Sequence, residues 1–233
     1  MTPTISDPAF WVALLQIIGI DIVLAGDNAV VIALAARSLP VEQQRKAIIY
    51  GAGAAILIRV ILTSFAAALL TVPWVNIVGA ILLLWIGIKL LNHGNEDEGE
   101  NIKPASNLMG AIKTIVVADV VMSLDNVIGV AGAAKGSLTL LILGLLISIP
   151  LVIFSSQIIL KVMARWPVII VIGAGLLGWV AGDMAVRDFA IREWIVTNAA
   201  WLKYAAPATG AVFVVALGKW LAARAAQSDT KAA

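Results

Sequence analysis

Two copies of one short motif contain the acidic residues best suited to chemistry in this chain. Each copy has two aspartates six positions apart and an asparagine directly after the second: Asp21, Asp27 and Asn28, then Asp119, Asp125 and Asn126. Carboxylate and amide oxygens suit Mg²⁺, Ca²⁺ or Mn²⁺, whereas Zn²⁺ and Cu⁺ prefer imidazole or sulfur. The chain has no cysteine, and its single histidine, His93, lies in an acidic segment. The motifs therefore predict a site for an oxygen-liganded divalent cation.

The elements that carry these motifs are strongly apolar. Of the 233 residues, 61% are hydrophobic and 13% are charged, against about half and about a quarter in soluble domains. A membrane-spanning helix needs about 20 apolar residues. Seven stretches qualify, at 10–36, 48–72, 74–92, 108–134, 138–160, 167–183 and 204–223. We predict an all-α polytopic membrane protein in a lipid bilayer, with about seven transmembrane helices. Because lysines and arginines form no tract, no nucleic-acid partner is expected.

The motif aspartates are costly to bury in a membrane. A carboxylate at the bilayer centre costs roughly 2.5–3.5 kcal/mol, so four cost about 10–14 kcal/mol together. Only Arg59 and Lys89 are clearly intramembrane cations, so protons or a bound cation must neutralise the surplus. We expect Arg59 to be a counter-charge to an aspartate when metal is absent. Lys89 and Asp183 are gate residues, charge partners, or side chains that extend to the headgroups without a specific role.

A second repeated motif indicates an internal duplication. The pattern Gly-Ala-x-Leu-Leu-x-Trp starts at Gly79 and again at Gly173, which places Lys89 opposite Asp183. Three spans per copy make the second copy enter the membrane from the other face, as in transporters with inverted repeats. We predict an inverted 3+3 repeat plus a C-terminal helix. The expected divisions are a first repeat (1–92), an acidic cytoplasmic linker (93–106), an inverted second repeat (107–184), and an outer loop, seventh helix and cytoplasmic tail (185–233).

The spacing inside each motif conflicts with a regular helix. Asp21 and Asp119 lie about 16 Å into their stretches, near the midplane. Residues six apart are about 120° out of phase on a continuous helix, so Asp21 and Asp27 cannot both face one small ion. Either the two aspartates serve successive positions on a path, or the helix is interrupted. Gly26 makes an interruption before Asp27 the favoured interpretation.

Lysine and arginine in the loops predict the orientation. If the N-terminus is outside, ten of these residues lie inside and four outside. The inner set is Arg37, Arg45, Lys46, Lys103, Lys113, Lys161, Arg165, Lys219, Arg224 and Lys231, and the outer set is Lys135, Arg187, Arg192 and Lys203. An outside N-terminus and a cytoplasmic C-terminus are therefore expected.

The motifs resemble those of the TerC family of integral membrane proteins. The resemblance rests on Ala25-Gly26-Asp27-Asn28, Ser123-Leu124-Asp125-Asn126 and the two Gly-Ala-x-Leu-Leu-x-Trp copies, and it extends over roughly 10–223. The family is grouped with LysE-type transporters, and its members are associated with tellurium resistance and manganese export. The resemblance implies Mn²⁺ as the transported ion, a choice that the oxygen ligands leave open against Ca²⁺ and Mg²⁺. It also implies that all six motif residues listed first are metal ligands.

The sequence hypothesis is a secondary transporter in the cell (inner) membrane that exports Mn²⁺ and exchanges protons. We expect no prosthetic cofactor and no enzymatic activity, because no nucleophile–base pair or nucleotide motif is present. A homo-oligomer remains open. The alternative is a non-transporting scaffold or chaperone that contacts a stress or secretion complex through residues 93–106.

Overall fold

Helices form nearly all of the protein. The computed structural model describes residues 7–65, 72–92, 104–134 and 137–232, and no strand occurs in these ranges. In chain order the helices are α1 (Pro8–Ala36), α2 (Val41–Ser64), α4 (Val75–Asn92), α5 (Pro104–Ala134), α6 (Leu138–Arg165), α7 (Val168–Val186), α8 (Arg192–Asn198) and α9 (Leu202–Ala232). The predicted all-α class is confirmed, and each predicted stretch corresponds to one long helix.

Length and composition support a membrane location for these helices. Among the described residues, α2, α6, α7 and α9 can each cross a membrane unbroken, and α1 is a fifth candidate if its bent halves form one span. The apolar part of α4, Val75–Leu91, is shorter. Large apolar side chains such as Leu15, Leu57 and Trp85 are exposed on the outside of the bundle, where lipid would cover them. The chain is thus a polytopic membrane protein.

Several helix boundaries differ from the sequence prediction. Helix α2 begins at Val41, before the predicted start at 48. Helix α5 begins at Pro104, before the predicted boundary at 107, because proline is well suited to the first turn of a helix. Helix α6 continues past residue 160 to Arg165, whose positive charge is favourable in a last turn. The short helix α8, inside the predicted outer loop, was not predicted at all.

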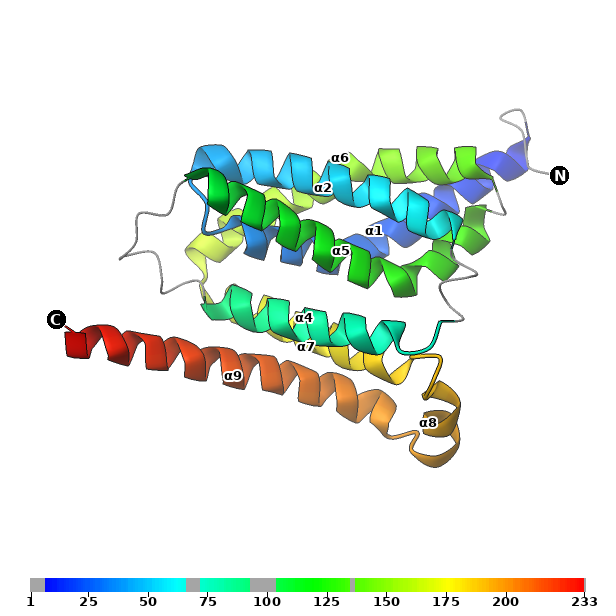
Figure 1. The fold of residues 1–233 in the computed structure, drawn as a ribbon. Helices are drawn as coiled ribbons and strands as arrows, with labels where there is room; N and C mark the ends of the chain where they lie inside the picture. The colour runs from blue at the N-terminus through cyan, green and yellow to red at the C-terminus, as the bar shows by residue number, and fades with distance from the viewer. Residues whose placement is uncertain (1–6, 66–71, 93–103, 135–136, 233) are drawn as a thin grey trace.

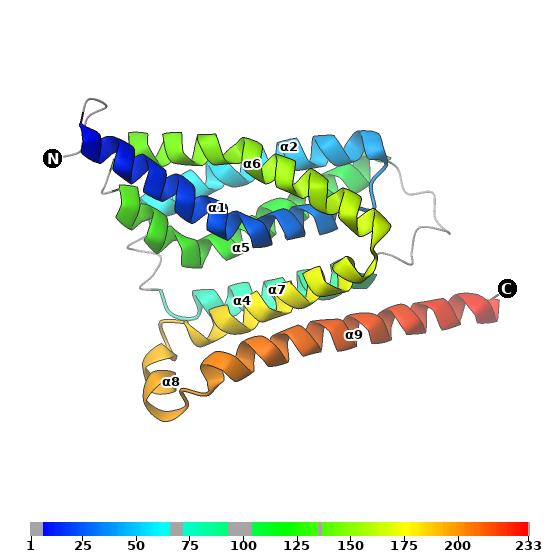
Figure 2. The same cartoon turned by 180° about the vertical axis from the view of Figure 1, so that it is seen from behind.

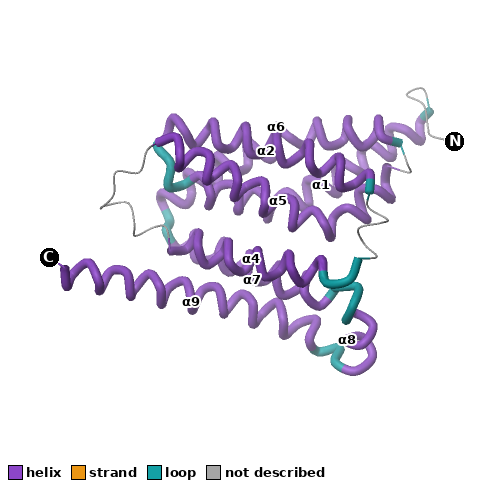
Figure 3. Tube along the Cα trace, viewed as in Figure 1, coloured by secondary structure: helices purple, strands orange, loops and turns teal. Residues whose placement is uncertain are grey.

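The long helices lie in two layers that Figures 1 and 2 show from opposite sides. Helices α1, α2, α5 and α6 form one layer, and α4, α7 and α9 form the other. Figure 3 shows the short loops that join the helices at the two ends of the bundle. Helix α9 packs mainly on α7, while α4 and α7 face the first layer through α5 and α1. Helices α1 and α5 are therefore central to the bundle.

Packing within the first layer is symmetric between the two halves of the chain. Helix α1 packs most extensively on α6, and α5 packs most extensively on α2. Along the chain the long helices alternate in direction, so that α1, α2 and α4 run opposite to α5, α6 and α7, respectively (Figure 1). Two copies related by a twofold axis in the membrane plane would pack in this way.

A carboxylate from a distant loop holds the beginning of α4. The Asp188 side chain is fully buried between α7 and α8. Its oxygens accept hydrogen bonds from the backbone N–H groups of Trp74 (2.9 Å), Asn76 (3.0 Å), Ile77 (3.3 Å) and Ala190 (2.8 Å). Because the first N–H groups of a helix have no partner within it, Asp188 acts as a long-range cap for α4. Sequence analysis missed this role.

An arginine holds the other end of the same helix. The Nη2 atom of Arg37, which follows α1, donates to the carbonyl oxygen of Leu90 in the last turn of α4 (2.7 Å). A negative group at the start of a helix and a positive group at its end both interact favourably with the helix dipole. Asp188 and Arg37 thus fix the short helix α4 between α1 and the α7–α8 loop.

Glycines bring α7 and α9 into backbone contact. A Cβ atom on Gly182 would lie 2.1 Å from the carbonyl oxygen of Ala206, and one on Gly178 would lie 2.2 Å from that of Gly210. Real Cβ atoms essentially never approach so closely. The spacing Gly178-x-x-x-Gly182 thus leaves room for the α9 backbone, and this contact attaches α9 to the bundle.

The glycine contact makes a stability prediction. Replacing Gly182 with alanine is expected to lower the stability of the protein by about 1–3 kcal/mol, because α9 must move away from α7. The control is Gly53→Ala in α2, where an added Cβ meets nothing within 4 Å and alanine favours the helix. Thermal unfolding in detergent should give changes in Tm of opposite sign. Equal Tm values would contradict the contact.

Candidate functional site

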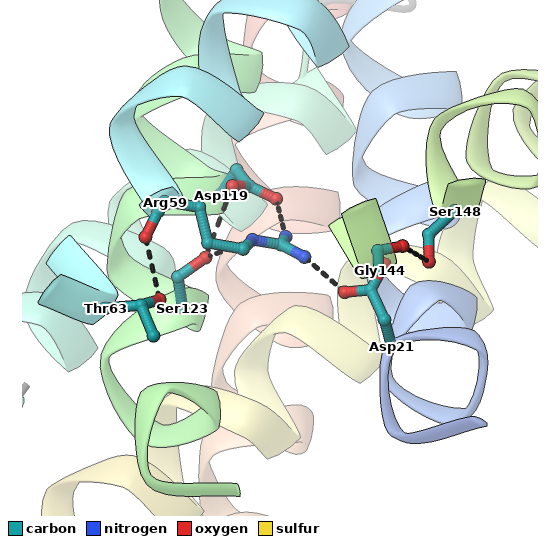
Figure 4. A network of polar contacts seen from close by, with 7 residues as sticks. All are labelled: Asp21, Arg59, Thr63, Asp119, Ser123, Gly144 and Ser148. Carbon is teal, nitrogen blue, oxygen red and sulfur yellow. Dashed lines mark hydrogen bonds and ion pairs between the residues drawn. The ribbon is translucent and has the colours of Figure 1, made fainter. Parts of the chain in front are cut away.

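One arginine joins the first aspartates of the two motifs in the interior of the bundle. Arg59 of α2 donates from Nη1 to Oδ1 of Asp21 in α1 (2.6 Å) and from Nη2 to Oδ1 of Asp119 in α5. Figure 4 shows its guanidinium group between the two carboxylates. All three residues are buried, with 3–6% of their surface exposed. The structure thus brings together two aspartates that are 98 residues apart in the chain.

Hydroxyl groups complete this network. Ser123, which is fully buried, accepts a hydrogen bond from Nε of Arg59 (2.9 Å) and donates one to Oδ2 of Asp119 (3.2 Å). Ser123 lies one helical turn after Asp119, which brings both side chains to the same face of α5. On the other side, Ser148 of α6 lies beside the Asp21 carboxylate and donates to the Gly144 carbonyl oxygen (3.1 Å) (Figure 4).

The charges in this network do not balance. Two carboxylates share one guanidinium group, so the buried cluster has one negative charge in excess when both aspartates are ionised. Breaking a buried ion pair is strongly unfavourable, because the remaining charge has no partner. Arg59 pairs with two aspartates at once, the arrangement expected of a counter-charge, and its predicted role when metal is absent stays a prediction. Because of this excess negative charge, the cluster could bind a further cation or proton without an additional acidic residue.

The first motif continues beyond a bend in α1. Its two parts, Pro8–Asp21 and Gly26–Ala36, are inclined to each other by 47°. This bend falls where the sequence predicted an interruption. It separates Asp21, which contacts Arg59, from Asp27, which is half-buried and forms no ion pair with a described residue. The bend changes the relative direction of the two aspartates from that on a straight helix.

Asn28 has an unsatisfied polar atom. Its side chain is 97% buried, and its Oδ1 atom accepts no hydrogen bond from the described residues. Buried amide oxygens normally have a partner, and an exception requires an explanation such as a missing ion or water. An amide oxygen is also a normal ligand of Ca²⁺ or Mn²⁺. Asn28 therefore has a free ligand atom next to Asp27.

The second motif is visible only in part. The backbone of α5 passes through Asp125 and Asn126, but their side chains lie outside the described part of the chain. Among the described residues, no group of three or more histidine, cysteine, aspartate or glutamate side chains is arranged to hold a metal ion. The assignment of all six motif residues as ligands stays a prediction.

Lys89 and Asp183 lie away from the Arg59 cluster. The Nζ atom of Lys89 lies 5.2 Å from the ring centre of Trp85 on the same helix. Asp183 pairs with Arg187 one turn further along α7 (2.7 Å), at the surface. These contacts suit local anchoring near the helix ends, and their predicted gate role stays untested. Residues 93–103 of the predicted acidic linker lie outside the described residues.

Sequence reasoning did not identify two residues of this architecture. Ser123 was named only as part of the second motif, although its spacing of four from Asp119 was the signal for a shared face. Asp188 lies outside the apolar stretches and had no such signal, because its partners are 111–114 residues away.

These features define an all-helical, polytopic integral membrane protein with a buried charge cluster where its two halves meet. A family profile described as "Integral membrane protein TerC family" matches residues 6–226, nearly the whole chain. The chain therefore belongs to the TerC family of integral membrane proteins.

Relatives from two bacteria support this assignment. The chain is 45% identical to the uncharacterized membrane protein YjbE of Bacillus subtilis over 77% of this chain and 81% of the relative. It is 25% identical to the uncharacterized membrane protein YceF of B. subtilis, over 79% and 75% of the two chains. The UPF0053 inner membrane protein YgdQ of Escherichia coli K12 is 26% identical, over 81% and 86%. No solved structure matches the chain.

Proposed function

We propose that this protein is a secondary transporter for a divalent metal cation, with Mn²⁺ as its first candidate substrate and export as its direction. The observation that carries the proposal is the sharing of Arg59 by Asp21 and Asp119. A purely structural pairing would match each buried carboxylate with its own cation. Here the carboxylates are in excess, and Asp27 adds a further half-buried one.

The substrate would bind where the two motifs approach each other. Asp21 and Asp119 would supply carboxylate oxygens, and Asp27 and Asn28 would supply ligands beyond the bend of α1. The unsatisfied Oδ1 atom of Asn28 supports this set. Oxygen ligands suit Mn²⁺, Mg²⁺ and Ca²⁺ alike, so Mn²⁺ is chosen on the family resemblance. Asp125 and Asn126 are the proposed counterparts in α5.

Arg59 would compete with the substrate. In the described structure its guanidinium group occupies the Asp21 and Asp119 carboxylates. A divalent cation would displace it and replace one positive charge with two. Ser123, which also bonds to Arg59, would keep the displaced side chain close by. Protons that bind the aspartates after release of the metal would then give the proposed coupling to proton entry.

The proposal includes a membrane location, an orientation and a mode of access. We infer residence in the bacterial inner membrane, a location that the name of YgdQ states for that relative. The proposed orientation is an outside N-terminus and a cytoplasmic C-terminus, from the ten-to-four distribution of basic residues. The opposed directions of α1 and α5 suit alternating access, in which the two halves rock about a central site.

Transport by the purified protein tests this proposal. Proteoliposomes should take up ⁵⁴Mn²⁺ above protein-free vesicles, and Asp27→Asn and Asp119→Asn should each reduce the rate about tenfold or more. A lost charged contact of about 1.5–3 kcal/mol has at least that effect on binding. In Asp119→Asn, Arg59 still pairs with Asp21, so the fold should persist. The control is Glu42→Gln, which neutralises an exposed carboxylate in the first turn of α2. Equal flux through all variants would reject the site.

A further inference from the structure

A second site lies at the end of the bundle where α2 starts and α6 ends. A cavity of about 630 Å³ opens there, a size that fits the range of small-molecule sites. Its polar wall contains Arg37, Arg45 and Lys161, and no aspartate or glutamate lines it. Its apolar wall is formed by Val41, Ile48, Leu160, Met163, Ala164 and Ile170. Cations therefore meet an apolar surface in one cavity.

The backbone of three segments brings the cations to the same mouth. Arg37 is fixed by its bond to the Leu90 carbonyl oxygen. Arg45 and Lys161 are exposed on α2 and α6. The first turn of α2 adds the positive end of a helix dipole, with exposed Glu42 as the acidic group nearest in sequence. The net charge around the mouth of the cavity is therefore positive.

We propose that this cavity binds an anionic phospholipid, with Arg45 and Lys161 contacting its phosphate group. A soluble phosphate needs only the cations. A phospholipid uses both walls, since its acyl chains can contact Val41, which is 81% exposed, and the other apolar side chains. The exposed Trp166 directly after α6 marks the depth of the headgroups. Basic pockets between transmembrane helices on the cytoplasmic side bind such headgroups.

The bound lipid would connect the two halves of the protein. The cavity wall takes residues from α2 of the first half and from α6 and α7 of the second. A lipid with its phosphate between Arg45 and Lys161 would bridge this junction, about which the halves must move in alternating access. The binding itself does not depend on the proposed transport activity.

Lipid titration of the full-length protein tests this site. The expected result is that phosphatidylglycerol binds the wild type and raises its Tm, whereas phosphatidylcholine and inorganic phosphate at equal concentration do not. The double variant Arg45→Gln/Lys161→Gln should weaken phosphatidylglycerol binding about 30-fold. Each cation near an anionic headgroup contributes about fivefold to the affinity, and the two contributions multiply. Native mass spectrometry gives the affinity, and thermal unfolding gives the shift.

The control is Lys46→Gln/Arg165→Gln, which removes two exposed cations from the same helices and the same end without changing the cavity wall. It should bind phosphatidylglycerol as the wild type does. Equal weakening in both double variants would overturn the site in favour of general surface charge. Equal binding of phosphatidylcholine would overturn recognition of the anionic headgroup, and stabilisation by inorganic phosphate alone would identify a soluble anion instead.

Discussion

Replacing Arg59 with methionine is expected to lower the stability of the protein by about 3–5 kcal/mol, the usual result of removing one partner from a buried ion pair. Asp21 and Asp119 would remain buried and face each other without their shared counter-charge. For a chain of this length, each 1 kcal/mol shifts Tm by about 2–4 °C. Thermal unfolding in detergent should therefore show a large decrease in Tm.

A compensating variant tests whether the loss of stability comes from unbalanced charge or from lost packing. The triple variant Asp21→Asn/Arg59→Met/Asp119→Asn has no buried charge at this position, and it should recover most of the lost stability. The control Arg187→Met removes an arginine whose side chain is 62% exposed and pairs with Asp183. Exposed pairs contribute about 0–1 kcal/mol, so its Tm should change little. If the triple variant is as unstable as Arg59→Met, the cluster is not held by charge.

Arg59→Lys gives a finer test of the same cluster. A guanidinium group has several donors in a fixed plane and can bond to Asp21, Asp119 and Ser123 together. An ammonium group is a compact charge on a flexible stem and cannot reproduce that arrangement. The stability of Arg59→Lys should therefore lie between those of the wild type and Arg59→Met.

The sequence predicted the fold class because the hydropathy of each stretch predicts a helix there, whatever the other stretches do. Seven apolar runs gave seven long helices, since backbone groups in lipid must be paired within a helix. The ends were less predictable. The start of α5 at Pro104 depends on the suitability of proline for a first helical turn. Helix α8 is short and buries Ile195 alone, which gives too weak a hydropathy signal to predict it.

The sequence also predicted the charged participants of the buried cluster, but it predicted neither Ser123 nor the geometry. The cost of burying the aspartates implied that Arg59 is a counter-charge, and the excess of carboxylates implied protons or a bound cation in addition. That one arginine would join Asp21 to Asp119 could not be derived, because it depends on how α2 packs between them. The phase of Asp21 and Asp27 left open either a path of successive positions or an interrupted helix, and Gly26 favoured the interruption near which α1 bends.

The second large effect is expected at the beginning of α4. Replacing Asp188 with alanine removes four hydrogen bonds to backbone N–H groups at once. Each bond to a charged acceptor is worth about 1.5–3 kcal/mol, and a buried donor left without a partner adds a penalty of its own. We expect the free energy of unfolding to fall by clearly more than the contribution of one such hydrogen bond, because the carboxylate is fully buried.

Asp188→Asn is the informative companion to that variant. An amide has nearly the same shape as a carboxylate but only one acceptor oxygen, so it can accept hydrogen bonds from only some of the N–H groups. It also lacks the negative charge that is favourable at a helix start. Its Tm should lie between those of the wild type and Asp188→Ala. Hydrogen exchange at Asn76 and Ile77 should increase in the same order, because their N–H groups bond to Asp188, while exchange in α6 should not. An equal increase in exchange along the whole chain would contradict a local cap. A local increase would show that the α7–α8 loop holds α4 at the side of α5, and that α4 depends on this distant carboxylate for its place in the bundle.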